Sequence, residues 1–212
     1  MKHLYKIRLR TEQTTKQYNI MTEKEKMLAG ELYDCGDPEL MKLWIHGKNL
    51  MQQYNNLDYS NKAEQLRVLD ELLGARGKHT QITAPFFVDY GKFIFLGNNC
   101  EINMNCVFLD CNHITIGDNA LIAPGVHIYT VFHPINAKER FNKSVHEEFP
   151  FATSKTMPVT IGNNVWIGGG SIILPGVTIG DNVTIGAGSV VTKSIRSNVL
   201  AFGNPCRVIK DI

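Results

Sequence analysis

The sequence predicts an all-β repeat fold, a parallel β-helix with an N-terminal helical cap and a long loop inserted in the helix. Three observations lead to this prediction. From Leu96 onward a large apolar side chain recurs at every sixth position, a small or β-branched residue stands two positions before it, and Gly, Asn and Asp fill much of the remainder. A period of six cannot be a helical stripe, because an α-helix repeats every 3.6 residues. It fits short strands on the flat faces of a prism, joined by tight turns, with three faces to a coil.

The repeat has two inward-facing registers. The large apolar positions are Leu96, Ile102, Phe108, Ile116, Ile122, Ile128, Ile161, Ile167, Ile173, Ile179, Ile185 and Val191. The small positions are Cys100, Cys106, Ala120, Val126, Val165, Ser171, Val177, Val183 and Ser189. Stacked coils would pair their strands in parallel and bury both sets. Cys100 and Cys106 are therefore interpreted as small interior residues rather than metal ligands, since the sequence has no Cys-x-x-Cys pair.

Differences in composition and in hydrophobic periodicity divide the chain into four regions. Residues 1–20 are basic and polar, and we expect a poorly ordered leader or extension there. Residues 21–80 have helical spacing and would cap one end of the prism. Residues 81–197 form the β-helix, with a loop at 132–158 that lacks the repeat. Residues 198–212 are a tail that can cover the other end.

Three helices are expected in the helical region. Thr22 and Glu25 have the spacing of a capping box at the start of the first. Pro38 follows a Gly-Asp break and suits the first turn of the second. The third is expected over 61–73 and is ended by Gly74. Packing is the simplest explanation for the apolar stripes of all three.

The bulk composition limits the class of protein. The 212 residues are 43% hydrophobic and 20% charged, which is typical of a folded globular chain and not of a disordered one. A net charge of +2 gives no electrostatic argument for nucleic-acid or membrane binding. The start of the chain lacks the apolar stretch of a secretion signal, so a reducing, cytoplasmic setting is expected.

Several segments together resemble the maltose and galactoside O-acetyltransferases, a family of hexapeptide-repeat acyltransferases. The matching segments are MLAGELYD at 27–34, FVDYG at 87–91, ITIGDNALIAPGV at 114–126, TVFHP at 130–134, VTIGNNVWIGGG at 159–170, IGAGSVVTKSI at 185–195 and GNPCRVI at 203–209. The repeat alone is moderately specific, whereas this combination is highly specific. The resemblance implies a left-handed β-helix, a homotrimer with active sites between subunits, and acetyl-CoA as a co-substrate, with no bound metal and no permanently bound cofactor.

His133 is the candidate general base. Acetyl transfer to a hydroxyl needs a base that removes the hydroxyl proton, and histidine suits this task near neutral pH. Of the seven histidines, His133 lies where the repeat breaks into the long loop. Position alone leaves a catalytic and an inert loop histidine equally open, and the resemblance implies the catalytic role. A loop glutamate would orient it, either Glu148, which we prefer, or Glu147.

The resemblance also implies residues that bind the acceptor. These are Asp34, Asp89, Asn103, Asp110 and Cys111. Carboxylate and amide groups are suitable partners for sugar hydroxyls. Cys35 and Cys111 stand where the galactoside enzymes have aspartates, so the acceptor is expected to differ from a galactoside unless Asp34 and Asp110 substitute.

The acetyl-CoA side falls later in the chain. The residues implied are Trp166, Gly169, Ala187, Thr192, Lys193, Arg207 and Lys210. Trp166 would form a flat wall near the reacting centre, and the Gly169 N–H would donate to the thioester oxygen. Arg207 and Lys210 can neutralise CoA phosphates. Taken singly, Lys193 is better explained as a solvent-facing turn lysine, and only the motif favours a role in binding CoA.

These residues predict direct acetyl transfer from acetyl-CoA to a sugar or glycoside hydroxyl. One alternative is an enzyme of the same fold that acetylates an antibiotic or an amino or nucleotide sugar. A zinc carbonic anhydrase also uses this fold but needs three converging histidines, and His127 and His133 lack a third partner at suitable spacing. A non-catalytic repeat scaffold is the remaining alternative.

Overall fold

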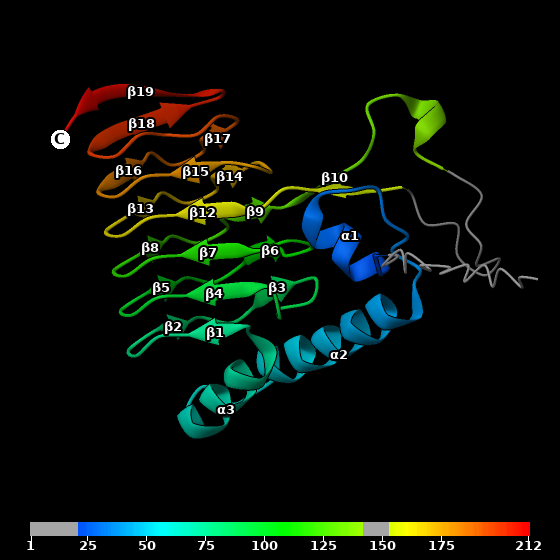
Figure 1. Cartoon of the computed structure of the whole chain (residues 1–212). Coiled ribbons are helices and arrows are strands. Elements are labelled where there is room, and N and C mark those ends of the chain that lie inside the picture. The colour runs from blue at the N-terminus through cyan, green and yellow to red at the C-terminus, as the bar shows by residue number, and fades with distance from the viewer. Residues whose placement is uncertain (1–20, 142–152) are drawn as a thin grey trace, which may run out of the picture.

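The computed structural model describes residues 21–141 and 153–212. The predicted leader, together with Glu147 and Glu148, lies outside these residues. The described chain is a parallel β-helix with helices at one end, so the predicted fold class is confirmed (Figure 1). Among the described residues, none of the helices combines the length and apolar character needed to span a bilayer.

The prism of the β-helix has three sheets, which the described chain visits in turn (Figure 1). Sheet 1 consists of β1 (Ala75–Arg76), β4 (Ile94–Leu96), β7 (Ile114–Ile116), β12 (Val159–Ile161) and β15 (Thr178–Ile179). Sheet 2 consists of β2 (Gln81–Ile82), β5 (Glu101–Ile102), β8 (Leu121–Ile122), β13 (Trp166–Ile167), β16 (Val183–Ile185), β18 (Val199–Gly203) and β19 (Cys206–Asp211). Sheet 3 consists of β3 (Phe86–Val88), β6 (Cys106–Leu109), β9 (His127–Tyr129), β14 (Ile172–Ile173) and β17 (Val190–Val191). Their strands pair in parallel except β19, which folds back antiparallel on β18 at the C-terminal end.

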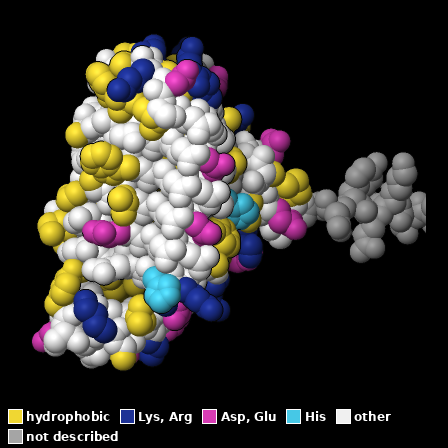
Figure 2. All heavy atoms as spheres, turned by 90° about the vertical axis from the view of Figure 1, so that its left-hand side faces the viewer, with side chains coloured by type: hydrophobic (Ala, Val, Ile, Leu, Met, Phe, Trp, Pro, Cys, Tyr) yellow, Lys and Arg dark blue, Asp and Glu magenta, His cyan; other side chains and the backbone are white. Residues whose placement is uncertain are grey.

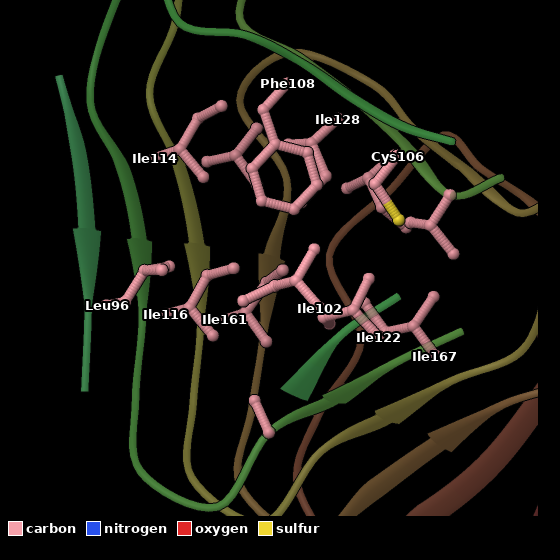
Figure 3. Packing of buried hydrophobic residues seen from close by; sticks show 14 of the residues in the cluster. Leu96, Ile102, Cys106, Phe108, Ile114, Ile116, Ile122, Ile128, Ile161 and Ile167 are labelled. Carbon is pink, nitrogen blue, oxygen red and sulfur yellow. The ribbon is translucent and has the colours of Figure 1, made fainter. Parts of the chain in front are cut away.

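Both predicted inward registers are buried. Every large apolar position and every small position of the repeat is at most 5% exposed. Figure 3 shows Leu96, Ile116 and Ile161 from sheet 1 stacked in a row, with Ile102, Ile122 and Ile167 from sheet 2 beside them. The sulfur of Cys106 lies in the same interior (Figure 3), so the interpretation of this cysteine as a small core residue is confirmed.

The N-terminal cap is made of α1 (Glu23–Ala29), α2 (Pro38–Asn55) and α3 (Lys62–Leu72). The predicted capping box is present, because the Glu25 N–H donates to Thr22 Oγ1 and the Thr22 N–H donates to the Glu25 carboxylate. Apolar residues of α2 and α3 join the same core as the first coil, below which these helices lie (Figure 1). Gly74 leads from α3 into the first coil of the prism. A β-carbon on this residue would lie 2.5 Å from the Lys92 carbonyl oxygen, which is too close for any residue other than glycine.

The corner between sheets 1 and 2 is a ladder of asparagines. The rungs are Asn99, Asn119, Asn164, Asn182 and Asn198, each with φ between 55° and 61°. Each side-chain amide donates to the next amide oxygen at 2.8–3.0 Å. Asparagine tolerates this left-handed conformation better than most residues. Figure 2 faces this side of the molecule, where backbone and uncharged polar atoms form much of the surface.

The long excursion leaves the prism after β9 and returns before β12. Its described part contains β10 (Val131–Phe132), the short 3-10 helix η1 (Ala137–Glu139) and β11 (Lys155–Thr156), with β10 and β11 paired antiparallel. The rungs Asn119 and Asn164 on either side are 45 residues apart, whereas the neighbouring rungs are separated by 20 and 18 residues. Nevertheless β12 pairs with β7 in register, Ile161 opposite Ile116. The insertion therefore leaves the packing of the prism unchanged.

Candidate active site

Sheet 3 has a pocket at each of its two corners. The chain leaves sheet 3 at Asp89, Cys111 and Val131, which follow β3, β6 and β9. There a pocket of about 230 Å³ forms between the prism, α2 and the base of the excursion. Its polar lining is Asp89, His133 and Ser154, and the rest of its lining is Tyr33, Cys35, Met41, Trp44, Tyr90, Cys111 and Val131. We call it the histidine pocket.

The ring of His133 is held by the returning strand. Its Nδ1 lies 3.1 Å from the Thr153 carbonyl oxygen and 3.4 Å from Ser154 Oγ. A carbonyl oxygen can only accept a hydrogen bond, so this contact favours the tautomer with the proton on Nδ1. Nε2 then carries the lone pair that a general base needs. The predicted orienting residue Glu148 lies outside the described residues, and the backbone carbonyl of Thr153 occupies that role within them.

β11, which begins two residues after Thr153, is anchored by a buried polar network. The Asn112 side-chain N–H₂ donates to Thr156 Oγ1 at 2.9 Å and to the Leu28 carbonyl oxygen at 3.1 Å. Thr156 Oγ1 in turn donates to the Met27 carbonyl oxygen at the end of α1. Asn112 and Thr156 are 2% and 1% exposed, so each bond is formed away from water. The helical cap thus fixes β11 and, through it, the partner of His133.

Asp89 lies at the floor of the histidine pocket between a lysine and a thiol. Its Oδ1 is 3.1 Å from Lys48 Nζ, and its Oδ2 accepts from Cys111 Sγ at 3.4 Å. Burial and the neighbouring carboxylates Asp89 and Asp110 raise the pKa of the Cys111 thiol well above its ordinary value. Cys111 is therefore a neutral donor and not a nucleophile.

Two of the predicted acceptor contacts prove to have structural roles. Asp110 is completely buried, and its carboxylate accepts from the backbone N–H groups of Asp89, Tyr90 and Phe93 at 2.9–3.1 Å. Burial raises the pKa of Asp110 to about 7, although hydrogen bonds from the backbone N–H groups of Gly91, Tyr90 and Phe93 oppose that change. Asp110 thus shapes the turn under the pocket, and its carboxylate is not exposed to the pocket in this structure. Asp34 accepts from the Gly36 N–H at 2.8 Å and lies behind Cys35, which lines the pocket in its place.

The second pocket lies at the corner between sheets 2 and 3. It is lined by Glu101, Asn103, Leu121, Ile122, Ala123, Pro124 and Trp166, and we call it the tryptophan pocket. Trp166 is 54% exposed. Asn103 was predicted to join Asp89 around the acceptor, but within this chain it lies here, beside Trp166 and apart from His133.

The predicted acetyl-CoA residues are divided between the same two corners. Gly169 follows β13, and a β-carbon there would lie 3.1 Å from the Pro124 carbonyl oxygen of the tryptophan pocket. Ala187 stacks on the coil above, against Gly168. Thr192 and Lys193 instead follow β17, on the corner of the histidine pocket, and both are exposed. The exposed Arg207 and Lys210 belong to β19 at the C-terminal end.

Two residues at or beside the histidine pocket were not identified from the sequence as functional candidates. Trp44 was interpreted as a packing residue, but it is 38% exposed and lines the pocket. Lys48, one turn later on α2, was not singled out, although its Nζ contacts Asp89 of the pocket lining. Their i, i+4 spacing was the available signal. Over 21–141 and 153–212, no group of three or more His, Cys, Asp or Glu residues is arranged to hold a metal ion.

Comparison with known proteins gives consistent matches. The family model for the maltose acetyltransferase hexapeptide capping motif matches residues 26–77, and that for the bacterial transferase hexapeptide (six repeats) matches 158–193. A putative acetyltransferase of Dictyostelium discoideum is 48% identical over 91% of this chain and 95% of its own length. The crystal structure of a maltose O-acetyltransferase from Clostridium difficile 630 is 47% identical, with a TM-score of 0.84, and covers 92% of this chain and 99% of that one. A galactoside acetyltransferase in complex with coenzyme A is 38% identical, with a TM-score of 0.84, and covers 91% of this chain and 92% of that one.

Proposed function

The chain belongs to the hexapeptide-repeat family of acetyl-CoA-dependent O-acetyltransferases, and from this premise we propose that it acetylates a hydroxyl of a small sugar-like acceptor by direct transfer, with His133 as the general base. One observation carries the assignment of the base. The contact of His133 Nδ1 with the Thr153 carbonyl oxygen leaves Nε2 as the proton acceptor, and the ring lies at the mouth of a pocket that also holds a carboxylate.

The proposed reaction has one covalent exchange. His133 Nε2 takes the proton of the acceptor hydroxyl, and the hydroxyl oxygen forms a bond to the thioester carbonyl carbon. The Gly169 N–H donates to the oxyanion that develops on the carbonyl oxygen. The carbon–sulfur bond then breaks, and the imidazolium of His133 returns its proton to the thiolate, which releases CoA and the acetyl ester.

The location of the two pockets supports a trimer with active sites between subunits. The tryptophan and histidine pockets lie at opposite corners of sheet 3, so a single subunit keeps the predicted donor wall and the base apart. A ring with three-fold symmetry joins unlike surfaces of neighbouring subunits, which would bring the histidine pocket of one subunit to the tryptophan pocket of the next. The outer face of sheet 3 between these corners is largely apolar, with Phe87, Val107, Ile172 and Val190 beside His127, which suits such an interface.

A thiol-release assay with acetyl-CoA and a panel of neutral glycosides tests the activity. Release of CoA with formation of an acetyl ester supports the proposal, and no release with any hydroxyl acceptor contradicts it. We also propose a cytoplasmic location, where acetyl-CoA is made and where the five cysteines, all free in the structure, would stay reduced.

A mixing experiment tests the shared site. His133→Ala and Gly169→Leu each inactivate a different corner, so each homotrimer is expected to be inactive. In mixed trimers some interfaces combine an intact His133 with an intact Gly169 of the next subunit, and random mixing would restore about a quarter of the wild-type activity. Mixed trimers that are verified by native mass spectrometry and remain inactive would contradict the inter-subunit site.

A further inference from the structure

The negative charge of Asp89 in the histidine pocket is neutralised by Lys48 of the same chain. Among the described residues that line this pocket, Asp89 alone carries a carboxylate. Lys48 Nζ lies 3.1 Å from its Oδ1 and also donates to the Val88 carbonyl oxygen. The lysine and aspartate side chains are 28% and 20% exposed, so the pair is partly shielded from water and from salt. An incoming ligand therefore meets an ion pair and not a free negative charge.

The same lysine occupies the aromatic surface that could otherwise attract a cation. Lys48 Nζ lies 5.2 Å from the centroid of the Trp44 ring, within the range of a cation–π interaction. Aromatic faces and carboxylates are the two features by which proteins usually recognise ammonium groups. Here one protein cation, Lys48 of the helical cap, already contacts both the Trp44 ring and the Asp89 carboxylate that line the pocket.

The remaining lining and the proposed chemistry also disfavour a cationic ligand. Met41, Val131 and the neutral thiol of Cys111 give no countercharge. During the proposed reaction His133 becomes an imidazolium, which adds a positive charge to a pocket whose carboxylate is already paired with Lys48. An ammonium group on the acceptor would be repelled by both.

We propose that Lys48 is the specificity-determining residue that restricts the acceptor to uncharged hydroxyl compounds and excludes compounds that carry an amine. This inference rests on the proposed function and refines its substrate class. Asp89 still accepts hydrogen bonds from acceptor hydroxyls, because each carboxylate oxygen has a second lone pair. Lys48 is a positioning residue in this scheme, since it acts through Asp89 and Trp44 and not on the reacting atoms.

A matched pair of acceptors tests the proposal. Propyl glucoside and 2-aminoethyl glucoside have the same number of heavy atoms and differ by a methyl against an ammonium group. For the wild-type trimer we expect kcat/KM for O-acetylation to be at least about tenfold higher with propyl glucoside. Equal values would overturn the proposal while leaving acetyl transfer intact. No ester from any neutral glycoside would overturn the proposed function itself, which is a distinguishable result.

Two substitutions locate the effect on Lys48. Lys48→Met removes the cation, and we expect the preference for propyl glucoside to fall at least about threefold, because Asp89 and Trp44 become available to the ammonium group. Lys62→Met is the matched control, since Lys62 Nζ also lies over an aromatic ring, that of Tyr59 at 4.3 Å, but outside the histidine pocket. An unchanged preference in folded Lys48→Met, or an equal change in Lys62→Met, would overturn the role of Lys48. Lys48→Arg retains the charge and is expected to retain the preference, so loss of preference there would contradict the charge argument.

Discussion

Sheets 1 and 3 bury the same kind of ladder inside the prism but differ in their outer faces. In sheet 1 the outward row is Ala75 and Phe95 followed by Thr115, Thr160 and Thr178. In sheet 3 the corresponding row is Phe87, Val107, His127, Ile172 and Val190, which is apolar except for His127. The three threonines show that coils stack without an apolar exterior. The largely apolar face of sheet 3 is therefore not needed to form the prism, and such a face is typical of a contact surface.

The corners differ in the same way. The corner between sheets 1 and 2 is occupied by the asparagine ladder, whose side chains hydrogen-bond to one another from coil to coil. The two corners that border sheet 3 carry the histidine and tryptophan pockets instead. One corner thus stabilises the stack, and the sheet opposite it is the one proposed to bring the parts of the site together.

The largest effect is expected from a charge on the outer face of sheet 3. Ile172→Lys places an ammonium group where a neighbouring subunit would exclude water, so the trimer should dissociate and activity should fall about a thousandfold. Light scattering and the thiol-release assay measure both. Thr160→Lys, in the same coil on sheet 1, is the control and should leave both unchanged. Equal effects of the two substitutions would remove the distinction between the faces.

The next effect concerns the histidine that borders sheet 3. His133→Ala should lower kcat about a hundredfold or more while the protein stays folded, because the general base is lost. His113→Ala, just before β7 of sheet 1, should leave kcat unchanged, since His113 only packs against Phe93 and Phe95. Unchanged turnover in the first variant would refute the assignment of the base.

A smaller effect on kcat is expected from the network behind His133. Asn112→Leu leaves buried partners without donors, so the free energy of unfolding should fall by about 2 kcal/mol and kcat about tenfold as β11 shifts. Asn55→Leu is the matched control. Asn55 exchanges two hydrogen bonds with the Phe86 backbone at the first coil, and its loss should lower stability while kcat is retained. If both variants lose stability and keep kcat, Asn112 has no part in positioning the base.

The smallest effect belongs to the asparagine corner and is confined to stability. Asn164→Ala loses the bonds to Asn119 and Asn182 and puts alanine, which tolerates the left-handed conformation less well than asparagine, at a φ of 56°, so the free energy of unfolding should fall by about 1–2 kcal/mol. Asn164→Gly loses the same bonds without the strain and should be destabilised less. Urea denaturation separates the two variants, and kcat should be unchanged in both. A reversed order would show that backbone conformation is not what selects asparagine here.

The sequence predicted the prism well because its signal is repeated. Each coil has inward-facing residues at the same positions of the repeat, so the position of Cys106 in the repeat was enough to predict that it lies in the interior. The site was less predictable because its partners depend on stacking across coils of unequal length. Asp110 and Cys111 are adjacent in sequence, yet one is buried on backbone amides and the other lines the pocket. The Thr153 carbonyl has no side-chain signature at all.

The register that β12 keeps with β7 has a consequence for how such enzymes diversify. Because the prism resumes as if nothing had been inserted, the excursion can lengthen, shorten or change composition without disturbing the coils that are proposed to hold the donor. Selection can therefore act on the acceptor side as a separate module. An engineer could likewise exchange this segment between relatives and expect the scaffold to fold as before.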